Sequence, residues 1–155
     1  MDSWDSKAEY ALAAAADLAA HYAPGLPVKV SEIARRTGAP PKYLTQLLPR
    51  LRSSGLVSST KGPRGGYRLM RPPDRISVAE VLSAVSTPYG RHRSFSLSEP
   101  YRLALDRVSA ELEAARRGLL RRVTLARLAQ MLQGPGAGAE AEAEAAGGGN
   151  AADRG

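Results

Sequence analysis

One side of the segment between residues 41 and 53 carries side chains that can bind nucleic acid. These side chains recur in steps of three and four, the spacing of one helix face, at Lys42, Thr45, Gln46, Pro49 and Arg50. In the major groove, glutamine bonds adenine, threonine contacts the thymine methyl, and lysine or arginine reaches guanine or phosphate. Tyr43 either contacts the DNA or packs under the helix. The spacing predicts a DNA-reading helix, with a plain solvated helix face as the alternative.

A basic, glycine-rich loop follows in the stretch "SSTKGPRGGYRL", residues 58–69. Glycines allow the backbone to approach a ligand closely, and the charged side chains of Lys61 and Arg64 can bind phosphates or enter a minor groove. We therefore predict DNA contacts at Lys61, Arg64, Gly65 and Gly66. The alternative is a turn whose glycines serve only positive φ angles.

The charge of the chain agrees with a polyanionic partner. The whole chain carries +7, and its last 22 residues carry −3, so residues 1–133 carry +10. Ten lysines and arginines stand against two acids between Ser31 and Arg75. Such an excess attracts nucleic acid, although a solvated basic surface has the same composition.

Few residues are suited to catalysis or to metal binding. The chain has two histidines and no cysteine, and we find neither a phosphate-binding glycine loop before a helix nor paired carboxylates in the predicted core. We expect no enzymatic activity, no cofactor and no metal site. The polar N-terminus and the lack of a long apolar run predict a cytoplasmic protein without a membrane segment.

Three predicted helices position the DNA-reading side chains. Apolar residues at helical spacing run from Ala8 to Tyr22, a second helix spans about Ser31 to Thr37 and ends at Gly38, and a third starts at Pro41. The buried face of the third helix is predicted at Leu44, Leu47, Leu48 and Leu51. Pro49 removes one helical hydrogen bond, so we expect a distorted third helix. The short turn between the second and third helices predicts a helix-turn-helix.

Beyond Gly55 the apolar period changes from that of a helix to that of a strand. Residues 56–60 and 67–70 read as two strands joined by "KGPRGG". Ser77 and Glu80 form a capping box that starts a further helix. The predicted fold is thus mainly α with a small β-hairpin wing: a winged helix-turn-helix domain plus a long C-terminal dimerisation helix.

The C-terminal part predicts self-association. Apolar residues spaced 4, 3, 4, 3, 4 form the seam of a coiled coil: Tyr101, Leu105, Val108, Leu112, Ala115 and Leu119. A helix lying on its own domain is the alternative. Thr124 caps a last short helix. The predicted organisation is a DNA-binding domain (1–87), a linker (88–98), a dimerisation helix with the short helix (99–133), and a disordered Gly/Ala/Glu tail (134–155).

From about Ser6 to Leu132 the chain resembles the Rrf2 family of bacterial winged-helix regulators. The resemblance lies in "VSEIARRTGAPPKYLTQLLPRLRSSGLVSSTKGPRGGYRL", "RPPDRISVAEVLSAV" and "VTLARLAQML". It implies a homodimer with crossed C-terminal helices on a pseudopalindromic operator in double-stranded DNA. It also implies that Lys61 enters the minor groove and that Lys42, Tyr43, Thr45 and Gln46 read the major groove.

The chain departs from this family at two places. Many members carry three linker cysteines that hold an iron–sulfur cluster, whereas this linker has none and offers only His92 as a ligand. The resemblance is therefore to members without a cluster, some of which respond to a small molecule or a partner protein. Ahead of the second helix, Lys29 and Val30 replace the usual polar cap, which leaves Ser31 as the available cap.

We expect a sequence-specific transcriptional regulator, most simply a homodimeric repressor without a cluster. The rival interpretation is a winged-helix scaffold that acts through protein contacts or binds DNA without sequence choice.

Overall fold

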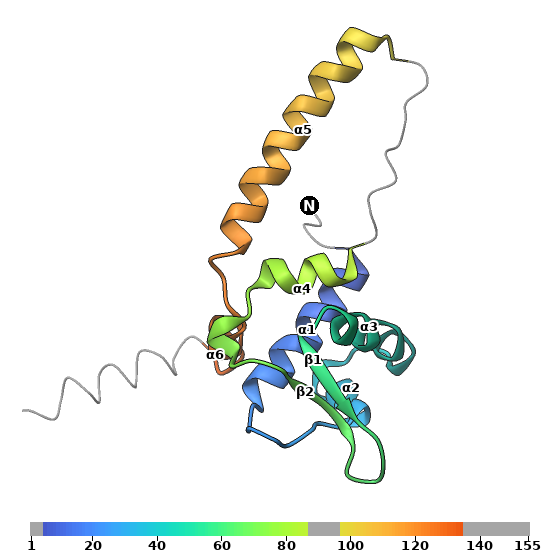
Figure 1. Cartoon of the computed structure of the whole chain (residues 1–155), viewed down its shortest axis with the longest axis vertical. Helices are drawn as coiled ribbons and strands as arrows, with labels where there is room; N and C mark the ends of the chain where they lie inside the picture. Colours follow the sequence, from blue (N-terminus) through green and yellow to red (C-terminus); the bar gives the residue numbers. More distant parts are fainter. Residues whose placement is uncertain (1–4, 87–96, 135–155) are drawn as a thin grey trace, which may run out of the picture.

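Helix α1 (Ser6–Ala20) lies at the centre of the domain, in contact with α2, α3, α4, α6 and the second strand of the hairpin (Figure 1). The computed structural model describes residues 5–86 and 97–134. Asp5 caps α1 by accepting a hydrogen bond from the Ala8 amide at 2.7 Å. The buried face of α1 is mostly alanine, whose small side chain lets neighbouring helices approach closely. Tyr22, which the sequence pattern placed on this helix, lies beyond its end and is exposed.

Helices α2 (Val30–Thr37) and α3 (Pro41–Ser53) form the predicted helix-turn-helix. Gly38 ends α2 in the left-handed conformation, with φ of 76°, as its position after the helix predicted. The predicted cap at Ser31 is wrong. Helix α2 starts one residue earlier, after Lys29, and no side chain caps it. The Lys29 carbonyl can accept the first helical bonds without a polar side chain, and the amides of Glu32 and Ile33 donate to it.

The leucine face predicted for α3 is confirmed. Leu44, Leu47, Leu48 and Leu51 are all buried in the core. The helix continues through Pro49, so the proline does not end it. The Ser53 hydroxyl donates to the Pro49 carbonyl at 3.0 Å. The burial of four leucines on one side leaves the opposite side of α3 at the surface.

The wing is a two-stranded antiparallel hairpin of β1 (Val57–Thr60) and β2 (Gly66–Leu69). Its second strand is tied to the segment before α2 near the wing loop, because the backbones of Val28 and Tyr67 exchange hydrogen bonds of 2.7 and 2.8 Å. Gly66 lies against this connection, where a Cβ atom would collide with the Val28 carbonyl. Only glycine fits there, so the first residue of β2 has a structural need for that residue type.

Helix α4 (Val78–Val85) starts at the predicted capping box. The Glu80 amide donates to the Ser77 hydroxyl at 3.2 Å, and the Ser77 amide donates to the Glu80 carboxylate at 2.9 Å. A short 3-10 turn (Pro73–Arg75) connects β2 to this helix. Arg71, just after β2, donates to the same carboxylate at 2.7 Å. The end of the wing is thereby joined to the start of α4.

Helix α6 (Leu125–Leu132) packs against α1 and belongs to the same core, with Leu125 fully buried. Thr124 caps it as predicted, because its hydroxyl accepts a hydrogen bond from the Arg127 amide. The residues that start α4 and α6 lie side by side, since the Val78 amide donates to Val123 and the Leu125 amide donates to Ile76. The organisation predicted from the sequence assigned this short helix to the same unit as the long helix before it.

Helix α5 (Glu99–Leu120) extends away from the domain (Figure 1) and buries none of its residues in the single chain. The predicted linker and tail fall mainly on residues 87–96 and 135–155, outside the described residues. None of the helices in the described ranges has the length and apolar character needed to cross a bilayer.

The Glu80 interactions predict an acid-sensitive contribution to stability. Burial by itself would raise the pKa of Glu80, but the hydrogen bonds from Ser77 and Arg71 outweigh it and leave this pKa below its ordinary value. A lowered carboxyl pKa stabilises the fold above the unfolded pKa of about 4.3, and this stability is lost as the pH falls through the folded value. At pH 7, Glu80→Gln should cost less than about 1 kcal/mol, because both partners are partly exposed.

The difference in unfolding free energy between Glu80→Gln and the wild type should shrink between pH 7 and pH 3.5, measured by urea denaturation. Asp106→Asn, which removes an exposed carboxylate on α5, serves as the control. A difference for Glu80→Gln that stays constant with pH would contradict the assignment.

Candidate nucleic-acid interface

The side of α3 predicted to read DNA, which we call the stripe, consists of Lys42, Thr45, Gln46, Pro49 and Arg50. Four of these five residues are exposed: Lys42, Thr45, Gln46 and Arg50. The Thr45 hydroxyl donates to the Lys42 carbonyl at 2.8 Å. This bond holds the hydroxyl oxygen against the helix and leaves the methyl group without a bonding role. Lys42 and Gln46 have no side-chain hydrogen bond within the described part of the chain. The first two turns of α3 therefore offer a cation and an amide to a ligand.

The two arginines in the last turn of α3 lie on opposite sides of the helix. Four-residue steps advance about 40° beyond a full turn, so the row from Lys42 through Gln46 winds round to α4 at Arg50. There the Arg50 guanidinium donates to the Val85 carbonyl at 3.2 Å. Arg52 lies on the other side, where it donates to the Ser59 hydroxyl of β1 at 3.0 Å. Arg50, which the sequence placed among the DNA-reading residues, therefore contacts the end of α4.

Sequence reasoning missed Arg52. The residue follows Thr45 by seven positions, which is close to two full helical turns, so the two side chains leave the same side of α3. This spacing could have identified Arg52 from the sequence as a residue on the same side of α3 as Thr45. What the sequence did not contain was the neighbour that Arg52 bonds, because Ser59 belongs to the wing.

Tyr43 packs against α1 at the edge of the interface. Its ring centroid lies 5.3 Å from that of Tyr10, with the ring planes tilted by 33°. Tyr43 nevertheless remains partly accessible to solvent, with 41% of the residue exposed. Both alternatives for Tyr43 thus stay compatible with the structure, since one ring face packs on Tyr10 while the rest meets solvent.

The loop of the wing presents Lys61 and Arg64, both exposed. The Gly65 amide donates to the Gly62 carbonyl at 2.9 Å, which closes the turn. Gly65 is buried against the Thr60 carbonyl, where a Cβ atom would collide. Gly65 and Gly66 therefore shape the wing itself, and the two cations stand out from it.

The charge of this region is of one sign. From Pro41 to Pro73, which covers α3 and the wing, the chain has seven lysines and arginines and no acidic residue. No carboxylate of the segment itself therefore neutralises these cations. Of the seven, Arg71 pairs with Glu80 outside the segment. The excess of positive charge that remains attracts a polyanion.

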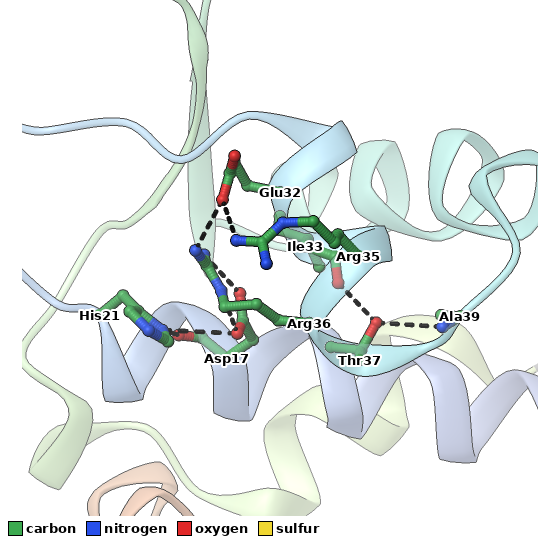
Figure 2. A network of polar contacts seen from close by, with 8 residues as sticks. All are labelled: Asp17, His21, Glu32, Ile33, Arg35, Arg36, Thr37 and Ala39. Atoms are coloured by element: carbon green, nitrogen blue, oxygen red, sulfur yellow. Dashed lines mark hydrogen bonds and ion pairs between the residues drawn. The ribbon is translucent and has the colours of Figure 1, made fainter.

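An ion pair between a buried carboxylate and a partly buried arginine holds the helix-turn-helix against α1 (Figure 2). Asp17 of α1 is 4% exposed and accepts two hydrogen bonds from Arg36 of α2, at 2.8 and 3.0 Å. The same guanidinium donates to Glu32 at 3.1 Å, and Arg35 donates to that carboxylate at 2.9 Å. Bidentate pairing of this kind fixes orientation as well as distance. It therefore sets how α2, and with it the turn to α3, lies on the domain.

The pKa values of Arg36 and Glu32 reflect these contacts. The hydrogen bonds to Asp17 raise the pKa of Arg36 above its ordinary value, which burial only partly opposes. The hydrogen bond from Arg35, together with its charge, lowers the pKa of Glu32. Thr37 closes the end of α2 by donating to the Ile33 carbonyl at 2.7 Å and accepting from the Ala39 amide at 3.1 Å (Figure 2).

The fold and this surface define a winged helix-turn-helix protein of the DNA-binding class. The model of the Rrf2 family, described as "Iron-dependent Transcriptional regulator", matches residues 4–131. The chain therefore belongs to the Rrf2 family of transcriptional regulators, as its resemblance predicted.

Relatives and solved structures agree with this placement. The chain is 40% identical over 128 residues to Rv1287 of Mycobacterium tuberculosis, a protein named as an HTH-type transcriptional regulator, and the match covers 80% of this chain and 79% of that one. It is 52% identical over 80 residues to the regulator IscR of Xenorhabdus nematophila, covering 52% and 48%. The structure of IscR from T. potens aligns with a TM-score of 0.65 at 30% identity, covering 97% and 94%. CymR, the global cysteine regulator of B. subtilis, aligns with a TM-score of 0.66 at 29% identity, covering 84% and 98%.

The Asp17–Arg36 pair predicts unequal effects of two neighbouring arginine substitutions. Arg36→Gln should lower the free energy of unfolding by about 2 to 4 kcal/mol, because it leaves the buried Asp17 carboxylate without its guanidinium and with only the partly exposed His21 ring, 3.4 Å away, beside it. Arg35→Gln is the matched control, since Arg35 is exposed and contacts only the surface carboxylate of Glu32. Urea denaturation followed by circular dichroism measures both. Equal losses would show that the buried pair does not hold α2.

Proposed function

We propose that the protein is a homodimeric, sequence-specific DNA-binding regulator that acts in the cytoplasm, most simply as a repressor. One observation carries this proposal above the others: the outer side of α3 and the neighbouring wing are exposed, basic and free of acidic residues from Pro41 to Pro73. A stable leucine face holds α3 in place, so its outer side is available for recognition rather than needed for the core.

In the proposed complex the start of α3 lies in the major groove of an operator. Gln46 bonds an adenine edge, the Thr45 methyl contacts a thymine, and Lys42 reaches guanine or phosphate. Tyr43 contacts the adjacent backbone with the open part of its ring. Arg50 bonds Val85 through one nitrogen, so its remaining N–H groups are the ones available to a phosphate.

The wing occupies the neighbouring minor groove. Lys61 and Arg64 enter the groove or bind the phosphates along it, where their charge releases counterions. Gly65 and Gly66 bring the backbone of the wing close to the DNA, a role that adds to their structural one. The wing supplies affinity for most sequences, while α3 supplies the choice of sequence.

Dimerisation through α5 is supported by the apolar side chains that this helix leaves in water. The predicted seam, at Tyr101, Leu105, Val108, Leu112, Ala115 and Leu119, is exposed along its whole length, with Leu112 at 67%. Large apolar side chains repeated over three heptads are rarely left to solvent. Two copies paired along α5 would bury them and present two wings and two copies of α3 to a pseudopalindromic operator.

The iron dependence described for the family does not fit the side chains of this chain. Iron–sulfur clusters are held by cysteine thiolates, and the sequence has no cysteine. The described residues also include no group of three or more histidines and carboxylates placed to hold a metal ion. We therefore infer a regulator without a cluster, whose signal is a small molecule or a partner protein.

The sequence-specific reading is tested with DNA selected from a random pool by the purified protein. Gln46→Ala should relax the choice of base at one position of each half-site, at a cost of about 1 to 3 kcal/mol for the preferred base. The measurement is fluorescence anisotropy with the selected duplex and with single-base variants of it.

Lys61→Ala is the matched comparison. Because it removes a phosphate or groove contact, it should weaken binding to all duplexes alike and lower the salt dependence by about one unit per lost contact. Equal affinity of the wild type for the selected and the random duplex would instead support a scaffold that binds DNA without sequence choice.

The dimer is tested by one substitution on the seam and one off it. Leu112→Glu should convert the protein to a monomer, because paired helices would have to bury the carboxylate. Leu103→Glu is the control. Leu103 is also exposed on α5 but falls out of the seam spacing. Sedimentation equilibrium reports the mass of each variant, and a Leu112→Glu protein that remains dimeric would place the contact elsewhere.

A further inference from the structure

We infer that Arg52 binds the phosphate backbone between the two grooves and so fixes the distance at which α3 and the wing engage DNA. This inference rests on the proposed function and adds a residue that neither the stripe on α3 nor the wing loop contains.

The position of Arg52 is set by two elements at once. It leaves α3 on the side of Thr45, and its Nη1 atom donates to the Ser59 hydroxyl of β1 at 3.0 Å. Just beyond it the chain turns, where the Leu56 amide donates to the Leu51 carbonyl at 3.0 Å. The guanidinium therefore lies at the junction of α3 and the wing.

In the proposed complex, the junction of α3 and the wing would face a defined part of the DNA duplex. When one element enters the major groove and its neighbour enters the adjacent minor groove, a single sugar–phosphate backbone runs between the two. A cation held between α3 and β1 faces that backbone. Contacts to phosphates fix the register of a protein on the duplex and carry no base information.

The chemistry of the side chain suits this position. A guanidinium has five N–H groups in a rigid fork, of which the bond to Ser59 uses one. The side chain is exposed, and no carboxylate among the described residues pairs with it. Ser59 therefore orients the fork without neutralising its charge, which leaves the remaining N–H groups for phosphate oxygens.

Arg68 provides an internal comparison. It donates to the hydroxyl of Ser58 at 3.0 Å, the same kind of bond that Arg52 makes one residue further along the strand. Neighbouring residues of a strand point to opposite faces, so Arg68 lies on the face of the hairpin turned away from Ser59 and α3. Both arginines are exposed, but only Arg52 lies between the two DNA-binding elements.

The experiment measures binding of Arg52→Ala, Arg52→Lys and Arg68→Ala to the selected duplex and to a random duplex at several salt concentrations. Arg52→Ala should weaken binding to both duplexes by about tenfold for each subunit bound, the usual effect of losing a hydrogen bond to a charged group. Its salt slope should fall by about 0.9 for each subunit bound. Arg52→Lys should lie between Arg52→Ala and the wild type, since it keeps the charge and loses the fork. Arg68→Ala should bind almost as the wild type does.

Ethylation interference locates the contact. Ethylation of one phosphate per half-site, on the strand between the two grooves, should block the wild type and leave Arg52→Ala unaffected. Identical behaviour of Arg52→Ala and Arg68→Ala, with a wild type that binds DNA, would overturn this inference and leave the proposed function standing. A wild type that binds no duplex would overturn both. Unchanged unfolding curves for the three variants ensure that a loss of binding is not a loss of fold.

Discussion

The bidentate pair between Asp17 and Arg36 is the interaction on which the placement of the DNA-binding surface depends. Helix α2 buries only Ile33 completely, so apolar packing alone gives it a small anchor. The two hydrogen bonds from Arg36 to a carboxylate that is 4% exposed hold both its distance and its rotation against α1. Because α3 follows α2 after only three residues, this contact and the buried leucine face of α3 together set the orientation of its outer face.

A second constraint links the wing to the long helix. Arg71 follows β2 and bonds Glu80, which also closes the capping box at Ser77. The segments that begin α4 and α6 are in turn joined through their backbones. The end of α5 is thus connected to the wing through a few short hydrogen bonds.

The wing shows how structural and functional demands meet in the same residues. Gly65 and Gly66 are required where backbone comes too close for a Cβ atom, at Thr60 and at Val28. Because these glycines have no side chains, Lys61 and Arg64 are the charged groups that the loop presents to solvent. In the proposed complex, a loop built this way approaches DNA closely while its cations reach the phosphates.

The sequence by itself determined the helices, the hairpin, the helix caps at Gly38, Ser77 and Thr124, and the basic character of the surface. These features depend on residues close together in the chain, such as the leucine spacing of α3. Only the tertiary structure decided which distant groups meet. It turned Arg50 to the end of α4, brought Arg52 to Ser59, placed α6 in the core, and paired Asp17 with Arg36. The physical reason is that such contacts join elements far apart in sequence, whose approach is set by the packing of the whole core and leaves no local pattern to read.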